Sequence, residues 1–433
     1  MKAYIEKLQS NPSYTKLLEW GRLLSVTSLA QIFVQVIGFL SGIIVIRFLS
    51  LEEYAFYTLA NTILGTMTLL ADGGVSAGVL SQSGKVWKEK SKLGKVLATG
   101  LSLRKKLAFF SLCISVPLLF FLLKHHGSSW LMATLIALAL IPAFYADLSS
   151  ALLVIVPKLH QDIPPILMND IKVGLGRLFL TTFLIFIFPF TFIALLANGL
   201  PRLYGNIQLK KIAAPYFKPE KVDPKIEKKI WSTVKRMFPG VLYYCFSGQI
   251  MLWIISFFGN TTSLAQLGAL ARIAVILGLI TKLSQTLVIP RFARLQEERK
   301  RLFKYYLQIC FFLVLIIAAF ISVGYLFAEE ILWILGDKYS GLQFELLLVL
   351  LGGGINLLSA ISFELNISRD WIINPLFSIS LSIATMIIGA IFLDIAQLTG
   401  VLIFNILLAV VQFLINFVYG FTRMKKLPSI SIN

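Results

Sequence analysis

The residues of this sequence that could do chemistry are conspicuous because they interrupt long apolar stretches. Six ionisable side chains fall inside such stretches: Asp72, Asp147, Arg177, Arg272, Lys282 and Glu364. An ionisable group at membrane depth costs about 2.5–3.5 kcal/mol on insertion scales, so it normally faces a water-filled cavity or a partner. Arginine donates bidentate hydrogen bonds to phosphate and does not lose its charge. These residue types predict a site for an anionic head group within the membrane.

The cationic residues differ in their predicted depth in the membrane. Arg272 and Arg177 lie closest to the middle of their spans, and we predict Arg272 as the main substrate-binding residue with Arg177 beside it in the same cavity. Arg47 ends the first span and is predicted to receive the same group as the cavity opens outward. Lys282 lies nearer the inner surface, where it either binds substrate or extends to the interface.

The carboxylates are candidates for binding a coupling ion or a proton. Asp72, Asp147 and Glu364 all lie nearer the inner surface, and Glu364 is close enough to extend to the interface. An alternative for the two central arginines is a buried ion pair with Asp147 or Asp72. No spacing motif decides between these interpretations.

The composition identifies the class of protein. Of 433 residues, 57% are hydrophobic and 14% are charged, whereas soluble domains average about 45–50% and 25%. This excludes a disordered chain, a secreted disulfide scaffold and an ordinary cytosolic enzyme. The three cysteines lie in apolar stretches without CxxC spacing, and no HExxH or ATP-binding GxxxxGK[ST] motif is present. We therefore expect no metal and no cofactor.

Apolar segments long enough to cross a membrane recur along the whole chain. A span needs about 20 mainly apolar residues, which predicts about twelve. They lie near 24–48, 54–80, 107–123, 130–156, 168–188, 189–208, 238–258, 263–289, 304–327, 343–367, 372–393 and 397–421. The separation at Pro189 has little polar sequence to support it. The predicted fold is an all-α integral membrane protein with two six-helix bundles that enclose a central cavity.

The net charge of +19 predicts the orientation. With alternating spans and a cytoplasmic N-terminus, most of the 40 cations fall on the cytoplasmic side, which is the expected asymmetry. Both termini are then cytoplasmic, in a multi-pass protein of the inner membrane. The basic segments are predicted to contact anionic lipid, not nucleic acid. The external connections are short, which leaves little room for the external loop of a membrane glycosyltransferase or polymerase, so we expect no enzymatic activity.

The chain is predicted to divide into three parts. An N-terminal bundle covers 1–208, a basic cytoplasmic linker covers 209–236 and a C-terminal bundle covers 237–433. Within the linker, Asp223-Pro224 is a good helix start. Ile226, Ile230 and Val234 follow on one face, which predicts an amphipathic helix lying on the inner leaflet.

Glycines mark a possible hinge. Gly352, Gly353 and Gly354 are consecutive in the middle of the tenth span, where glycine is costly unless something requires it. They are candidates for bending during transport. The alternative is close packing of helices through small residues.

The stretch from Ala30 to Ser81 resembles a known family. An Arg at the end of the first span is followed by Glu53-Tyr54-Ala55, by Tyr57-Thr58-Leu59 and by Asp72-Gly73-Gly74. This is similar to the first two helices of bacterial polysaccharide flippases, the Wzx-like O-antigen and capsule translocases of the MATE-like MOP exporter superfamily. Ala55 stands where the family usually has glycine, and no acidic residue lies near Trp253.

The resemblance implies a function. Such flippases carry an undecaprenyl-pyrophosphate-linked oligosaccharide repeat unit to the outer leaflet of the cytoplasmic membrane by alternating access, for lipopolysaccharide or other polysaccharide biosynthesis. They often work beside a polymerase and a chain-length regulator. The alternative within the superfamily is an ion-coupled multidrug exporter, which would favour an acidic and aromatic cavity. An amino-acid permease would predict two broken helices at matching positions of the halves, and no clear mate to Gly352–Gly354 exists.

Overall fold

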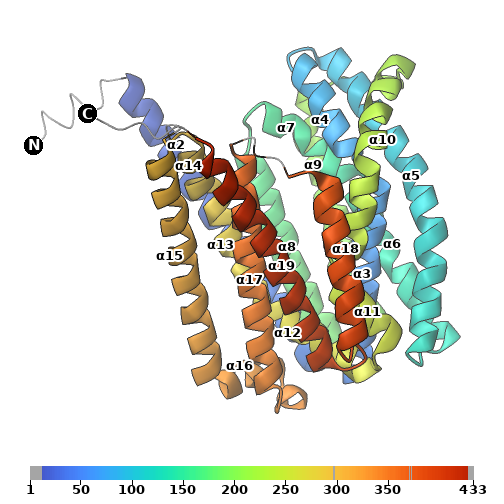
Figure 1. The fold of residues 1–433 in the computed structure, drawn as a ribbon. Coiled ribbons are helices and arrows are strands. Elements are labelled where there is room, and N and C mark those ends of the chain that lie inside the picture. Colours follow the sequence, from blue (N-terminus) through green and yellow to red (C-terminus); the bar gives the residue numbers. More distant parts are fainter. Residues whose placement is uncertain (1–11, 296–297, 370, 372, 428–433) are drawn as a thin grey trace, which may run out of the picture. The chain divides into compact units, whose positions relative to one another are not determined.

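The structure, a computed structural model, describes residues 12–427 except 296–297, 370 and 372. The described residues form helices joined by short connections, with no strand among them (Figure 1). Among these described helices, seven are long and apolar enough to cross a membrane, and nine spans result if each of two bent pairs counts as one. Helices satisfy all their backbone hydrogen bonds internally, as a bilayer requires. The predicted all-α membrane class is confirmed.

Each predicted span overlaps a helix. The segments 168–188, 189–208 and 372–393 correspond to α8 (Pro164–Ile187), α9 (Thr191–Ala213) and α18 (Pro375–Phe392), which are shorter or more polar than the others. The separation predicted at Pro189 is confirmed, since α8 ends at Ile187 and α9 begins at Thr191.

The chain separates into two compact units, described here one at a time. The first comprises Met1–Phe48 and Ala60–Gly248, and the second comprises Leu49–Leu59 and Gln249–Asn433. Besides α8 and α9, the first unit contains α2 (Pro12–Phe48), most of α3 (Leu51–Asp72), α4 (Val75–Val86), α5 (Lys90–His125), α6 (Trp130–Leu153), α7 (Ile155–Leu159), the short 3-10 helix η1 (Ala214–Tyr216) and α10 (Pro224–Ser247).

The second unit contains the start of α3 and the helices from α11 onward. Besides α18, these are α11 (Ile250–Phe258), α12 (Thr261–Ala274), α13 (Leu277–Leu283), the π-helical turn η2 (Ser284–Val288), α14 (Ile289–Ala293), α15 (Arg299–Leu326), α16 (Ala328–Leu335), the 3-10 turn η3 (Asp337–Tyr339), α17 (Gln343–Ile367) and α19 (Leu398–Lys425). Its buried core lies mainly between α15, α17 and the end of α19.

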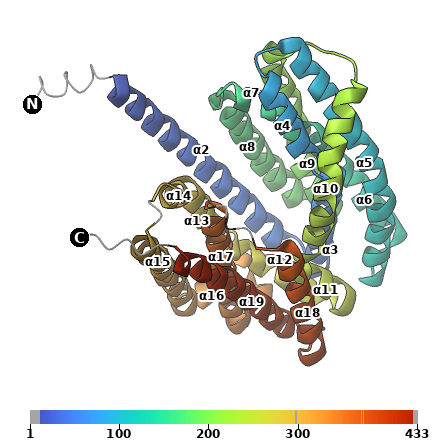
Figure 2. The same cartoon turned by 45° about the horizontal axis from the view of Figure 1, so that its top comes forward.

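The amphipathic helix of the linker is present, but its apolar face is buried in protein. Asp223 caps α10 by accepting a hydrogen bond from the backbone N–H of Lys225 at 2.8 Å, as its sequence predicts. Ile230 and Val234 are 0% and 2% exposed and pack in the core that α4 and α5 share. Figure 2 shows α10 beside these helices. The prediction that this face lies on the inner leaflet is therefore wrong, because apolar side chains of α4 and α5 form a protein surface that this face covers.

The connection before α10 is held against the start of α5. The N–H of Lys218 donates to the carbonyl of Lys90 at 3.0 Å, and the N–H of Asp223 donates to the hydroxyl of Thr99 at 3.1 Å. A Cβ added at Gly94 would lie 1.8 Å from the carbonyl oxygen of Lys218, so only glycine permits this approach. This segment belongs to the predicted linker, and it packs against a helix of the first unit.

A corner at Gly73-Gly74 ends α3. Both glycines have positive φ, 52° and 96°, which residues with a side chain rarely adopt. The chain bends by 44° between α3 and α4. The Asp72 carboxylate accepts hydrogen bonds from the N–H groups of Gly74 and Ser76, both at 3.2 Å. The physical basis of this corner is a capped left-handed turn.

Candidate functional site

Arg272 lies in the second unit against two tyrosines. Its guanidinium, in the last turn of α12, donates hydrogen bonds to the phenol oxygens of Tyr54 and Tyr57. The two rings stack with their centroids 5.9 Å apart, and both tyrosines are buried whereas Arg272 is half-buried. Among the described residues, no carboxylate pairs with Arg272. The cation is thus held in place by neutral groups and keeps its full charge.

Local sequence explains why α3 presents these tyrosines. The hydroxyl of Ser50 accepts a hydrogen bond from the N–H of Glu53 at 3.2 Å, in the spacing of a capping box. The helix that follows turns Tyr54 and Tyr57 to one face, because residues three apart are neighbours on a helix. On α12, a Cβ at Gly268 would lie 2.3 Å from the hydroxyl of Thr58. Glycine at this position therefore lets α12 approach the start of α3 closely.

The connection between α16 and α17 adds two residues to this region. The ammonium of Lys338 donates a hydrogen bond to the backbone carbonyl of Leu49, and Tyr339 is fully buried and close enough to Tyr54 for an electrostatic interaction. Neither residue was among the candidates that the sequence predicted. No motif marks them, because their role depends on which segment the loop covers.

Burial gives Lys338 a testable signature. Desolvation lowers the pKa of its amine from 10.5 to about 8. We expect acylation of this lysine to reach half its maximal rate near pH 8, measured by peptide mass spectrometry, because the neutral amine is the nucleophile. Between pH 8 and 10.5 the unfolded chain binds more protons at this site, so its contribution to folding stability rises with pH across that window. A profile centred near 10.5 would contradict the burial of this side chain.

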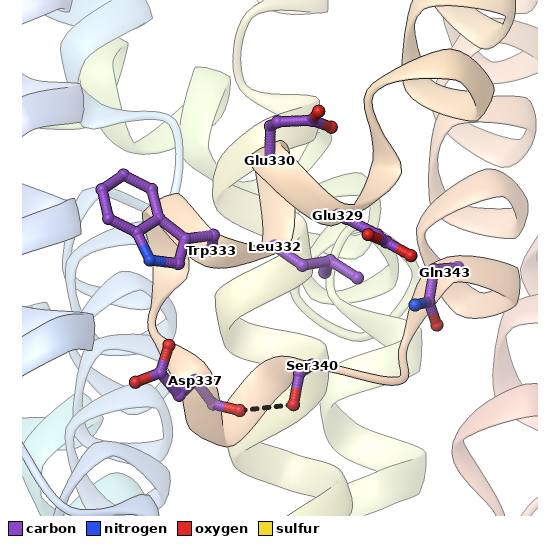
Figure 3. A pocket seen from close by; sticks show the side chains of 7 residues that line it. All are labelled: Glu329, Glu330, Leu332, Trp333, Asp337, Ser340 and Gln343. Carbon is purple, nitrogen blue, oxygen red and sulfur yellow. Dashed lines mark hydrogen bonds between the residues drawn. The ribbon is translucent and has the colours of Figure 1, made fainter.

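A pocket of about 460 Å³ lies next to this connection, within the second unit. Figure 3 shows its lining, which includes Trp333 and the carboxylates of Glu329, Glu330 and Asp337. The three carboxylates point in different directions, and the carbonyl of Asp337 accepts a hydrogen bond from the hydroxyl of Ser340 at 2.7 Å. The pocket is acidic and differs in charge from the surroundings of Arg272.

The first unit contains a chain of ion pairs around Arg104. This arginine is only 4% exposed, and its Nε lies 3.3 Å from Oδ1 of Asp72. Its Nη1 donates to the carbonyls of Asp147 and Leu148 at 3.1 and 3.0 Å. The carboxylate of Asp147 pairs in turn with Arg202 of α9 at 3.0 Å. Asp72 and Asp147 thus pair with Arg104 and Arg202. They do not pair with the two central arginines that the sequence analysis considered as partners.

Arg104 corrects an expectation about the basic segments. Its neighbours in sequence, Lys105 and Lys106, are exposed, as expected of a segment that contacts lipid. Arg104 instead points into the first unit, because it lies on the face of α5 that packs against α6 and the α3–α4 corner. The local density of charged residues does not reveal that Arg104 is buried. The nearby apolar residues Leu103 and Leu107, which are buried on the same helix, give a weak sequence signal for it.

The remaining candidates are dispersed. In the first unit, Arg47 is exposed at the end of α2, and Nη2 of Arg177 would lie 3.0 Å from a Cβ at Gly38. In the second unit, Lys282 is exposed on α13, and the carboxylate of Glu364 on α17 accepts a hydrogen bond from the amide of Gln285. Their roles in binding substrate or a coupling ion stay predictions.

The three consecutive glycines lie in an unbroken helix. Each would bring an added Cβ too close to a different neighbour: Gly352 to Asn405 at 2.7 Å, Gly353 to Leu277 at 2.9 Å and Gly354 to Ile317 at 2.5 Å. These neighbours belong to α19, α13 and α15. The contacts support the interpretation of close packing on three sides of α17, and bending at these residues stays a prediction.

Comparison with solved structures identifies the fold. A multidrug resistance MATE family transporter of the MOP superfamily, in an inward-facing conformation, has a TM-score of 0.71 at 14% identity, covering 91% of this chain and 96% of the other. The lipid II flippase MurJ, in an inward closed conformation, has a TM-score of 0.73 at 14% identity, covering 93% and 88%. A MATE structure in the bent conformation has a TM-score of 0.58 at 13% identity, covering 98% of both chains.

No protein-family model matches the sequence, and no curated protein matches it significantly. The similarity to the solved structures therefore lies in the backbone fold, and it extends over most of the length of both chains in each comparison. The chain is an all-α membrane protein with the fold shared by MATE transporters and the lipid II flippase MurJ.

Proposed function

We propose that this chain is a flippase that moves an undecaprenyl-pyrophosphate-linked oligosaccharide repeat unit from the inner to the outer leaflet of the cytoplasmic membrane. The observation that carries the proposal is Arg272, a cation at membrane depth that two buried phenols hold and that has no carboxylate partner among the described residues. The fold shared with a lipid II flippase supports a lipid-linked substrate. On this proposal the chain carries out transport and no covalent reaction, and the transport serves polysaccharide biosynthesis.

The geometry of the arginine suits a pyrophosphate. A guanidinium carries five N–H donors in a planar fork, so hydrogen bonds to Tyr54 and Tyr57 leave donors for an anion. The phenols fix the plane of the fork without cancelling its charge, which lowers the entropic cost of binding. A carboxylate in their place would neutralise the arginine and compete with substrate.

Of the two aspartates, Asp147 is the one at which we propose that an ion is coupled to transport. The carboxylate of Asp72 caps α4 and pairs with a buried arginine, so it has little freedom to exchange partners. Asp147 and its partner Arg202 are each about one-third exposed, so water or an ion can reach the pair. Protonation of Asp147 would release Arg202, so that a change of partner at this position would act as a two-state element.

The proposal is tested in a strain from which this chain has been deleted. Lipid-linked repeat units are expected to accumulate while surface glycan is lost, measured by lipid extraction and surface labelling, and the wild-type gene is expected to restore both. Normal lipid-linked pools together with altered drug sensitivity would overturn the proposal. They would favour the multidrug exporter, which the likeness to MATE transporters keeps as the second candidate. A polymerase and a chain-length regulator are the partners proposed from the resemblance.

A further inference from the structure

A groove of about 570 Å³ runs along the outside of the first unit between α5 and α6. Its floor is made of buried side chains, among them Met67 of α3, Leu119 and Phe144. Its rims are exposed apolar side chains, among them Phe109, which is 72% exposed. Exposed apolar residues are ordinary on a membrane protein, but here they border a concave surface and not a flat one.

The groove is long and narrow. The residues that α5 contributes follow one helix face at spacings of four and three: Lys105, Phe109, Leu112, Val116 and Leu119. At 1.5 Å per residue, this stripe extends about 21 Å along the helix axis. One leaflet of a bilayer is about 15 Å of hydrocarbon, half of the ~30 Å core. The stripe on α5 is thus longer than one leaflet is thick.

One end of the groove carries an uncompensated positive charge. Three cations are consecutive in α5, and two have carboxylate partners: Arg104 pairs with Asp72, and Lys106 pairs with Glu227 at 2.7 Å. Lys105 lines the groove and is exposed. Among the residues that the structure describes, none forms an ion pair or a hydrogen bond with Lys105. The exposed aromatic ring of Tyr145 on α6 also lines the groove.

We infer that this groove binds a lipid with a phosphate head group and one long hydrocarbon tail, with the phosphate at Lys105 and the tail along α5 and α6. The charge at one end complements a phosphate, and the apolar floor complements a tail. The choice of a polyprenyl tail rests on the proposed function, whereas the groove and its charge are features of the first unit and include none of the candidate substrate-binding residues.

Photolabelling in nanodiscs tests this inference. The full chain is reconstituted in phosphatidylcholine nanodiscs with a trace of one of three probes, each carrying a diazirine in the tail: a C55 polyprenyl phosphate, phosphatidylglycerol or phosphatidylcholine. Labelled peptides are located by mass spectrometry. We expect polyprenyl phosphate to label the groove segments of α5 and α6 most strongly, and Lys105→Gln to reduce that labelling about fivefold, as the loss of one lysine near a membrane surface implies.

Matched variants separate the groove from the general lipid surface. Ala137→Phe, which narrows the groove at a half-exposed position, is expected to reduce labelling by the polyprenyl phosphate. Lys106→Gln and Ile114→Phe, which change the same helix outside the groove, are expected to leave it unchanged. Equal labelling by phosphatidylcholine, or no effect of Lys105→Gln, would overturn the inference. Equal labelling by phosphatidylglycerol would overturn the assignment of a long single tail and indicate bulk anionic phospholipid.

Discussion

Replacing Arg272 by alanine is expected to reduce translocation of the proposed lipid-linked substrate roughly 10- to 100-fold, because a hydrogen bond to a charged group contributes about 1.5–3 kcal/mol. The variant removes the cation that Tyr54 and Tyr57 hold in place. Arg272→Lys keeps the charge but loses the planar fork, so it is expected to recover only part of the activity. The readout is the ratio of lipid-linked repeat units to surface glycan in the complemented deletion strain.

Variants of the two tyrosines and of a surface arginine serve as comparisons for Arg272→Ala. Tyr54→Phe and Tyr57→Phe each remove one phenol oxygen and are expected to lower export less than Arg272→Ala does. Arg423 also forms a pair with a tyrosine, donating to the hydroxyl of Tyr419 at 2.7 and 3.0 Å, but at an exposed position. Arg423→Ala is expected to leave export unchanged. Wild-type export by Arg272→Ala at normal protein levels would refute the role assigned to this residue.

Replacing Arg104 by leucine is expected to destabilise the first unit by about 3 kcal/mol or more, since removing one partner of a buried pair leaves the other uncompensated. Arg104 is 4% exposed and joins Asp72 to two backbone carbonyls of α6. The loss would be measured as the free energy of unfolding in detergent micelles. A double variant with Asp72→Asn is expected to be more stable than Arg104→Leu alone, because it removes the unpaired charge.

The neighbouring pair on α5 is the control for this prediction. Lys106 pairs with Glu227, but the lysine side chain is 64% exposed. Lys106→Leu is expected to cost about 0–1 kcal/mol, the usual value for a surface ion pair. Equal losses from Arg104→Leu and Lys106→Leu would show that burial does not distinguish the two cations.

The sequence by itself determined the helices. Apolar segments of about 20 residues can only be helical in a bilayer, because no water is present there to satisfy the backbone. Even the weakest boundary, at Pro189, lies where α8 and α9 separate. The corner at Gly73-Gly74 was also predictable, since two glycines after an aspartate allow the left-handed turn that Asp72 caps.

Only the tertiary structure decided the partners of the charged groups. Arg272 was predictable as a cation at membrane depth, but the tyrosines that hold it are more than 200 residues away in sequence. Arg104 belongs to a basic segment whose other cations are exposed, and the apolar face of α10 covers protein where its amphipathic pattern predicted lipid. Hydropathy depends on the residue and its near neighbours, so it is encoded locally. Pairing depends on which helix faces meet, and that is settled only when the bundle packs.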